Sequence, residues 1–160
     1  MKPVICRYPF DTKKYKVETS SPKGDFAHEK SPVSKYATDF LLPLGAEVLA
    51  AREGDVVFAK SDSNKHYTTK EAIGRGWSLG EMLLMAPKIT NRVLIKYGKI
   101  YFEYAHLGKN KVIINVGDEV NEGDLIGYVG MSGFTDLPHL HFNAAIKKGI
   151  DWKSIPVKFK

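Results

Sequence analysis

The stretch VGDEVNEGDLIGYVGMSGFTDLPHLHF, residues 116–142, decides the fold. It contains two Gly-Asp pairs, at 117–118 and 123–124, between short apolar runs, and it ends in two histidines that flank one leucine. Gly-Asp pairs between β-prone residues are typical of tight turns between short strands. Pro138 biases the residue before it toward an extended conformation. The stretch therefore predicts short strands joined by tight turns, followed by a strand that contains His139.

The segments before this stretch show the same β-rich pattern. Residues 36–60 alternate short apolar pieces with turn residues at 43–45 and 53–55, which predicts three short strands. Residues 91–107 carry β-branched and aromatic residues on both sides of Gly98 and predict a hairpin. Helix signals are scarce, so the sequence predicts a mainly β, antiparallel fold.

Residues 61–90 interrupt the β pattern. They begin with the polar run SDSNKHYTTKE and continue with the apolar run WSLGEMLLMAP. We expect an inserted loop here, with one short helix near residues 79–86. The N-terminal residues 1–38 are rich in Lys, Ser and Pro, and are predicted to form loops and short strands.

Length and composition indicate one folded domain over residues 1–160. Hydrophobic residues make up 43% and charged residues 26%, which excludes wholesale disorder and fibrous repeats. The lone Cys6 excludes an internal disulfide. No apolar run is long enough for a signal-peptide core or a bilayer span, so we expect no membrane span.

The chain carries an excess of basic residues. Lys and Arg number 24 against 18 Asp and Glu, a net charge of +6 that favours anionic partners in general. The hypothesis of a basic, nucleic-acid-binding β domain is supported by this charge alone, so we expect no nucleic-acid partner.

Two of the five histidines, His139 and His141, are spaced to share a strand face. Residues two apart on a strand lie roughly 6.5–7 Å apart along it and point to the same side. Neutral imidazoles are common zinc ligands, and His106 provides another one within the β context YAHL. Two histidines hydrogen-bonded at the end of a strand are the alternative for an isolated pair.

Asp39 strengthens the metal hypothesis. It lies in an apolar run, where an unpaired carboxylate is costly to bury and a metal ion would offset that cost. A turn or cap carboxylate, or an ion pair with Lys35, is the alternative.

Together these segments resemble the zinc metallopeptidases of family M23, the lysostaphin and LytM type. The resemblance rests on YATDFLLPLGAEVLAAREGDVV at 36–57, YAHL at 104–107 and the stretch 116–142. It covers residues 28–146 apart from the insertion at 61–90. It implies an antiparallel β-sheet groove, one zinc ion, and hydrolysis of peptide bonds in bacterial cell-wall peptidoglycan.

The resemblance also implies roles for four residues. Asp39 and His141 correspond to zinc ligands, and His106 and His139 to a catalytic pair that does not bind the metal. Which of these two histidines is the general base stays open. No H-E-x-x-H motif is present, so acid–base chemistry is assigned to histidine.

The third zinc ligand is where the sequence departs from the family. The common arrangement places a histidine four positions before the Asp, and here that position is Lys35, whose ammonium has no lone pair. His28, eleven positions before Asp39, is the best candidate, and His66 is its rival. If neither reaches the metal, the chain would be a degenerate M23-like module that binds wall peptide or regulates a partner hydrolase.

Two further expectations concern the substrate and the compartment. The insertion at 61–90 is predicted to form one wall of the substrate cleft, with Trp77 or Tyr67 contacting the peptide. A decoration that covers a sheet edge is the alternative. The family resemblance implies an extracytoplasmic location, although the sequence shows no signal peptide.

Overall fold

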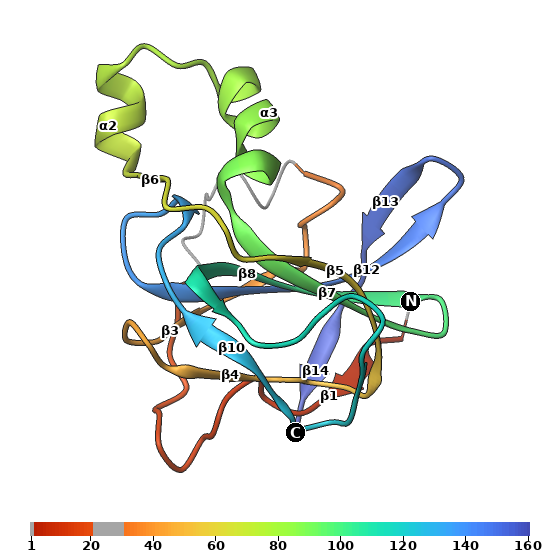
Figure 1. Cartoon of the computed structure of the whole chain (residues 1–160). Coiled ribbons are helices and arrows are strands. Elements are labelled where there is room, and N and C mark those ends of the chain that lie inside the picture. Colours follow the sequence, from red (N-terminus) through yellow and green to blue (C-terminus); the bar gives the residue numbers. More distant parts are fainter. Residues whose placement is uncertain (1, 21–30) are drawn as a thin grey trace.

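The protein is described here from a computed structural model, which describes residues 2–20 and 31–160. Strands dominate, and two helices lie between β6 and β7 (Figure 1). In chain order, the elements are β1 (Val4–Cys6), β2 (Thr19–Ser20), β3 (Thr38–Leu41), β4 (Glu47–Leu49), β5 (Gly54–Lys60), β6 (His66–Tyr67), α2 (Thr69–Gly74), α3 (Leu79–Ile89), β7 (Asn91–Tyr97), β8 (Ile100–Val112), β9 (Glu119–Val120), β10 (Leu125–Val129), β11 (Gly133–Phe134), β12 (His139–Lys148), β13 (Asp151–Ser154) and β14 (Val157–Phe159).

Most strands belong to one large antiparallel sheet. Its order is β2-β3-β12-β8-β7-β5-β9, while β10 pairs with both β4 and β8, and β13 pairs with β12. Two small parallel pairs, β1 with β14 and β6 with β11, complete the architecture. The predicted mainly β, antiparallel fold is confirmed.

Strand β12 shows how the sheet divides core from site. Leu140 and Phe142 are at most 1% exposed, and the Phe142 ring packs against Tyr104 of β8 at 5.2 Å between ring centres. Burial of each such side chain contributes about 1.5–3 kcal/mol. Because side chains alternate along a strand, His139 and His141 lie on the opposite face from this core.

The predicted turns are present where the Gly residues indicated them. Strands β7 and β8 form the hairpin around Gly98, with Tyr97 opposite Ile100. Asp118 accepts a hydrogen bond from the Asn115 backbone N–H at 2.7 Å and so closes the turn at the first Gly-Asp pair. The second pair closes in the same way with Asp124.

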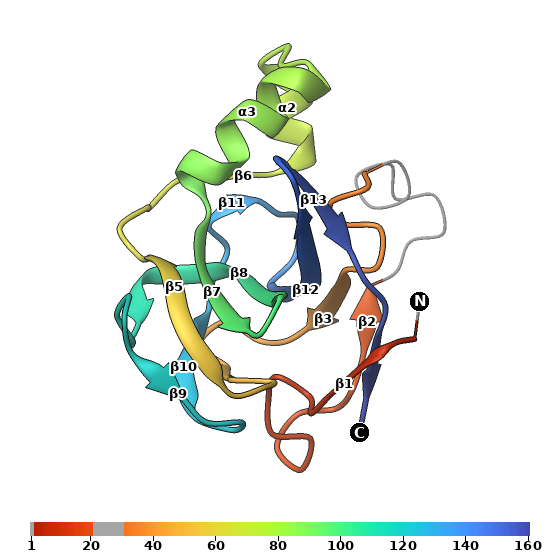
Figure 2. The same cartoon turned by 90° about the vertical axis from the view of Figure 1, so that its right-hand side faces the viewer.

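The insertion contains two helices: the helix predicted near residues 79–86 is present as α3, whereas α2 was not predicted. Helix α2 begins at a capping box in which Thr68 and Glu71 exchange side-chain-to-backbone hydrogen bonds. Residues 69–74 have no apolar periodicity, and the Thr-x-x-Glu spacing was the signal for this helix. Figures 1 and 2 show α2 and α3 projecting together from one end of the sheet.

Helix α3 is longer than expected. It extends through Pro87 to Ile89, and Ser78 and Glu81 form its capping box. A proline ends most helices, but Pro87 lies in the last turn, where only one intrahelical bond is lost. Leu83 and Leu84 are 60% and 74% exposed, so this helix contributes little to the core.

Candidate active site

Asp39 and His141 meet across neighbouring strands. β3 and β12 are antiparallel, and their register places Asp39 directly opposite His141. The carboxylate Oδ1 lies 2.8 Å from the imidazole Nδ1. Asp39 is only 8% exposed, and Lys35 lies instead over the ring of Tyr36, 5.6 Å from its centre. The register therefore pairs the buried carboxylate with an imidazole.

His139 lies on the same face of β12, two residues before His141. Its Nδ1 donates a hydrogen bond to the Leu137 carbonyl at 2.8 Å. Because a carbonyl oxygen can only accept, the Nδ1 carries the proton and the Nε2 has a free lone pair. That Nε2 lies 4.0 Å from Asp39 Oδ1. His139 is thus held in a fixed orientation beside the carboxylate.

His106 reaches the site through a β-bulge in β8. Asn91 of β7 pairs with Leu107 and Arg92 pairs with Ala105, so His106 is an extra residue with no partner on β7. Its φ of 64° lies in the left-handed region that non-glycine residues rarely occupy. Bulges re-aim side chains near active sites. The ring of His106 lies 4.6 Å from that of His139, measured between centres.

Hydrogen bonding and packing keep His106 neutral. Its Nδ1 donates to the Ser132 carbonyl at 2.7 Å, which leaves the Nε2 lone pair free. The surrounding protein lowers the pKa of His106 from 6.5 to about 3, chiefly because burial disfavours the charged ring, and further because His139 and His141 lie nearby. The His106 imidazole is therefore uncharged at physiological pH.

The donor atoms of this cluster suit a zinc ion. Zinc accepts imidazole nitrogen and carboxylate oxygen at about 2.0–2.2 Å in a tetrahedron, which places two ligand atoms about 3.3–3.6 Å apart. Asp39 Oδ1 and His141 Nδ1 are close enough to share one ion. The described residues contain no group of three or more side chains arranged as a complete metal site.

The structure describes only one of the two candidates for the third zinc ligand. His28 lies outside the described residues, so its assignment stays a prediction. His66 is exposed on β6, and its Nε2 bonds the Thr135 carbonyl at 3.0 Å.

Sequence reasoning missed a set of buried polar residues beneath His106. Ser63, Asn91 and Ser132 are at most 9% exposed and hydrogen-bond to one another. Ser132 lies within residues 116–142, directly after Met131. Asn91 is the first residue of the strongly apolar strand β7. A polar residue at the start of a buried strand was the available signal for Asn91.

The two aromatic residues predicted to contact substrate pack together at the base of the insertion. Tyr67 and Trp77 are in edge-to-face contact at 4.9 Å between ring centres, and both lie against Phe134 of β11. This cluster joins the insertion to the loop before β12. A cleft wall formed by the insertion stays a prediction.

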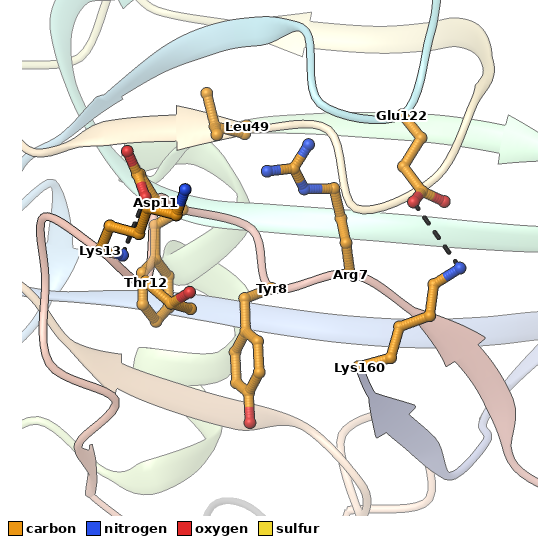
Figure 3. A pocket seen from close by; sticks show the side chains of 9 residues that line it. Arg7, Tyr8, Asp11, Thr12, Lys13, Leu49, Glu122 and Lys160 are labelled. Atoms are coloured by element: carbon orange, nitrogen blue, oxygen red, sulfur yellow. Dashed lines mark hydrogen bonds and ion pairs between the residues drawn. The ribbon is translucent and has the colours of Figure 1, made fainter.

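A pocket of about 520 Å³ opens elsewhere on the surface (Figure 3). It shares no residue with the histidine cluster, and Lys160 and Glu122 approach each other at its edge at 3.9 Å. Its lining residues are Arg7, Tyr8, Phe10, Asp11, Thr12, Lys13, Leu49, Glu122 and Lys160. The titratable groups of the pocket are therefore distinct from those of the site.

The chain is similar in sequence to known bacterial proteins. The chain is 26% identical over 142 residues to the peptidoglycan DD-endopeptidase ShyA of Vibrio cholerae serotype O1, covering 88% of this chain and 27% of that protein. It is 30% identical over 112 residues to lysostaphin of Staphylococcus simulans, covering 69% of this chain and 18% of that protein. The chain thus spans less than a third of the length of either relative.

Solved structures share the fold. A zinc-containing peptidase from Vibrio cholerae aligns with a TM-score of 0.59 and 25% identity, covering 88% of this chain and 36% of that one. The solution structure of lysostaphin aligns with a TM-score of 0.56 and 21% identity, covering 93% and 51%. The sequence profile described as "Peptidase family M23" matches residues 33–152. Since this match includes Asp39 and all three clustered histidines, and covers most of the chain, the protein belongs to peptidase family M23.

Proposed function

We propose that this chain is a zinc-dependent endopeptidase domain that hydrolyses peptide bonds in bacterial cell-wall peptidoglycan. The observation that carries the proposal is the convergence of Asp39 and His141 with two further imidazoles, His106 and His139, on neighbouring strands. The relatedness to ShyA, a peptidoglycan DD-endopeptidase, supports the choice of substrate.

Asp39 and His141 would hold the zinc ion, with His28 as the proposed third protein ligand. When bound, zinc polarises the scissile carbonyl and lowers the pKa of a bound water toward neutrality. The buried carboxylate would balance part of the metal charge. The donor types, one carboxylate oxygen and imidazole nitrogens, are those that zinc accepts.

His106 and His139 would carry the proton transfers. Both rings donate their Nδ1–H to backbone carbonyls, so both Nε2 atoms are free to accept a proton. With the ring centres 4.6 Å apart, the two rings can flank one reacting group. One Nε2 takes the proton of the attacking water, and protonation of the leaving amine completes hydrolysis.

A second candidate function is recognition of wall peptide without cleavage. The observation that favours it is the metal donor set, since two ligand positions converge in the described part of the chain and the third rests on His28. Such a module would bind peptidoglycan or regulate a partner hydrolase. It would share the groove but lack a stable metal ion.

The site of action is proposed to be extracytoplasmic, where peptidoglycan is found. Within residues 2–20 and 31–160, no helix has the length and apolarity needed to cross a bilayer. A peptide substrate is the proposed partner.

Metal analysis combined with a cleavage assay tests the proposal. Protein purified without chelator should contain one zinc per chain and should release peptides from purified sacculi. A chelator should abolish release, and added zinc should restore it. Zinc-free protein that takes up no zinc but co-sediments with sacculi would instead establish the binding module.

A further inference from the structure

We infer that Ser132 and Asn91 are positioning residues for His106, and that they connect this histidine to both ends of the insertion. The inference rests on the catalytic role proposed for His106. It assigns to the base of the insertion a part in catalysis that is separate from substrate contact.

His106 needs external support for its conformation. A non-glycine residue with φ near 64° is strained, and such residues persist only where neighbouring structure holds them. As the extra residue of a bulge, His106 has no cross-strand partner on β7. The regular ladder therefore does not determine where its ring points.

Ser132 supplies that support from two of its groups. Its carbonyl accepts the His106 Nδ1–H at 2.7 Å. Its hydroxyl donates to the Leu107 carbonyl at 2.7 Å and accepts from the Asn91 backbone N–H at 2.9 Å. One buried residue thus holds the ring of His106 and links the two strands that flank the bulge.

Asn91 completes the network with its side chain, and the residue is fully buried. The amide oxygen accepts from the Ser63 backbone N–H at 2.9 Å, and the amide nitrogen donates to the Ser63 carbonyl at 2.8 Å. The same nitrogen donates to the Leu107 carbonyl at 3.3 Å. Every polar atom of this side chain therefore has a partner in the peptide groups around the bulge.

The network also joins the two ends of the insertion. Ser63 lies near its start and Asn91 directly after its end, so the Asn91 amide closes the chain between them. Just beyond Ser132, Gly133 and Phe134 pair with His66 and Tyr67 at the base of the insertion. The insertion base consequently holds the loop whose carbonyl orients His106.

Glycine at position 133 makes this close packing possible. Its φ is 91°, and a Cβ there would lie 2.3 Å from Thr90 Oγ1 and 3.4 Å from His106 Nδ1. No side chain fits in that space without displacing its neighbours. The loop and the end of the insertion are thus in direct contact beside the imidazole.

Removing the Ser132 hydroxyl should free its carbonyl and loosen the His106 ring. Small misplacements of a catalytic group cost up to roughly 100-fold in rate. For Ser132→Ala we expect kcat for a cross-linked wall peptide to fall about 10- to 100-fold, with KM and zinc content little changed. Ser132→Thr keeps a hydroxyl and should recover most of kcat.

Ser154 offers a matched control. It is also buried, at 2% exposure, and its hydroxyl accepts from the Tyr36 N–H at 3.0 Å and donates to Asn143 Oδ1 at 2.8 Å. Ser154→Ala therefore removes the same kind of hydroxyl without touching His106. We expect a comparable drop in melting temperature with kcat retained. An equal loss of kcat in both variants, or an unchanged kcat in folded Ser132→Ala, would overturn the inference.

A spectroscopic measurement tests the positioning without an activity assay. The ¹⁵N spectrum of the wild-type His106 ring should show the Nδ1–H tautomer, with a proton that exchanges slowly. In Ser132→Ala the same ring should show mixed tautomers or faster exchange. A wild-type ring already in the Nε2–H form would overturn the inference even if the variant failed to fold. If His106→Ala cleaves normally, the proposed function fails, and the spectrum still decides the positioning.

Discussion

The β3–β12 strand pair and the β7–β8 bulge place their site residues by different physical means. In the strand pair, Asp39 and His141 meet because the antiparallel register puts them opposite each other. At the bulge, His106 leaves the register and depends on the hydrogen bond that its Nδ1 donates to the Ser132 carbonyl. The proposed metal ligands should therefore respond mainly to loss of their own side chains, whereas the proton-transfer role proposed for His106 should also respond to changes in its neighbours.

The largest effect is expected at the β3–β12 strand pair. Asp39→Ala and His141→Ala should each lose most bound zinc and all detectable hydrolysis, because each removes a metal donor. Elemental analysis of the purified variants measures this directly. Lys35→Ala is the control four positions before Asp39, and it should keep the metal. Zinc retained in Asp39→Ala would exclude this carboxylate as a ligand.

His28→Ala tests the one ligand that lies outside the described residues. We expect the same loss of zinc as for Asp39→Ala, because a tetrahedral catalytic site needs three protein ligands. His66→Ala is its control, since His66 bonds the Thr135 carbonyl and should not affect zinc content. Zinc loss in His66→Ala with retention in His28→Ala would reverse the assignment.

A smaller effect is expected when the proton-transfer residues are removed. His106→Ala and His139→Ala should keep zinc and lose roughly 10²- to 10⁴-fold in hydrolysis, as for loss of a general acid or base. Parallel zinc and rate measurements separate the two halves of the site. Loss of the metal in His139→Ala but not in His141→Ala would exchange the roles of the two β12 histidines.

A change beneath the bulge should have an intermediate effect. Gly133→Ala places a Cβ 2.3 Å from Thr90 Oγ1, so it should displace the Ser132 carbonyl and lower kcat by about 10-fold or more with zinc retained. Gly45 has a similar φ of 78° but open space around its Cβ position. Gly45→Ala should therefore lower stability by about 1 kcal/mol through strain and leave kcat unchanged. Equal kinetics in the two variants would mean that the bulge does not need this packing.

The smallest effect is expected at the tip of the insertion. Replacing residues 69–88 by a short Gly-Ser linker keeps Ser63, Tyr67 and Asn91 and removes the two exposed helices. Zinc content and kcat on a simple peptide should stay within about threefold of wild type, because the network around His106 is retained. A panel of wall peptides measures whether substrate preference changes, as a cleft wall would require. A collapse of kcat on all substrates would place the helices themselves in the support of His106.

Local sequence rules account for much of the fold. The two Gly-Asp turns, the hairpin at Gly98 and the strand with His139 and His141 all follow from patterns spanning a few residues. Helix α2 was not predicted, because its sequence carries a capping box but no apolar periodicity. The predicted helix near residues 79–86 ends before Pro87 because a proline ends most helices, whereas in the structure α3 continues through Pro87 with the loss of one hydrogen bond.

The spacing of His139 and His141 is enough to place them on one face of a strand, because side-chain direction alternates with period two along a strand. It also marked Asp39 as a carboxylate that needs a partner, because burying an unpaired charge is costly. His106 joins them through tertiary contacts. Its bulge, its positive φ and its bond to Ser132 depend on contacts between residues far apart in the sequence, such as His106 with Ser132, 26 positions apart, and Ser63 with Asn91, 28 positions apart. No local pattern encodes such contacts, because they form only when the insertion base, β8 and the loop before β12 pack together.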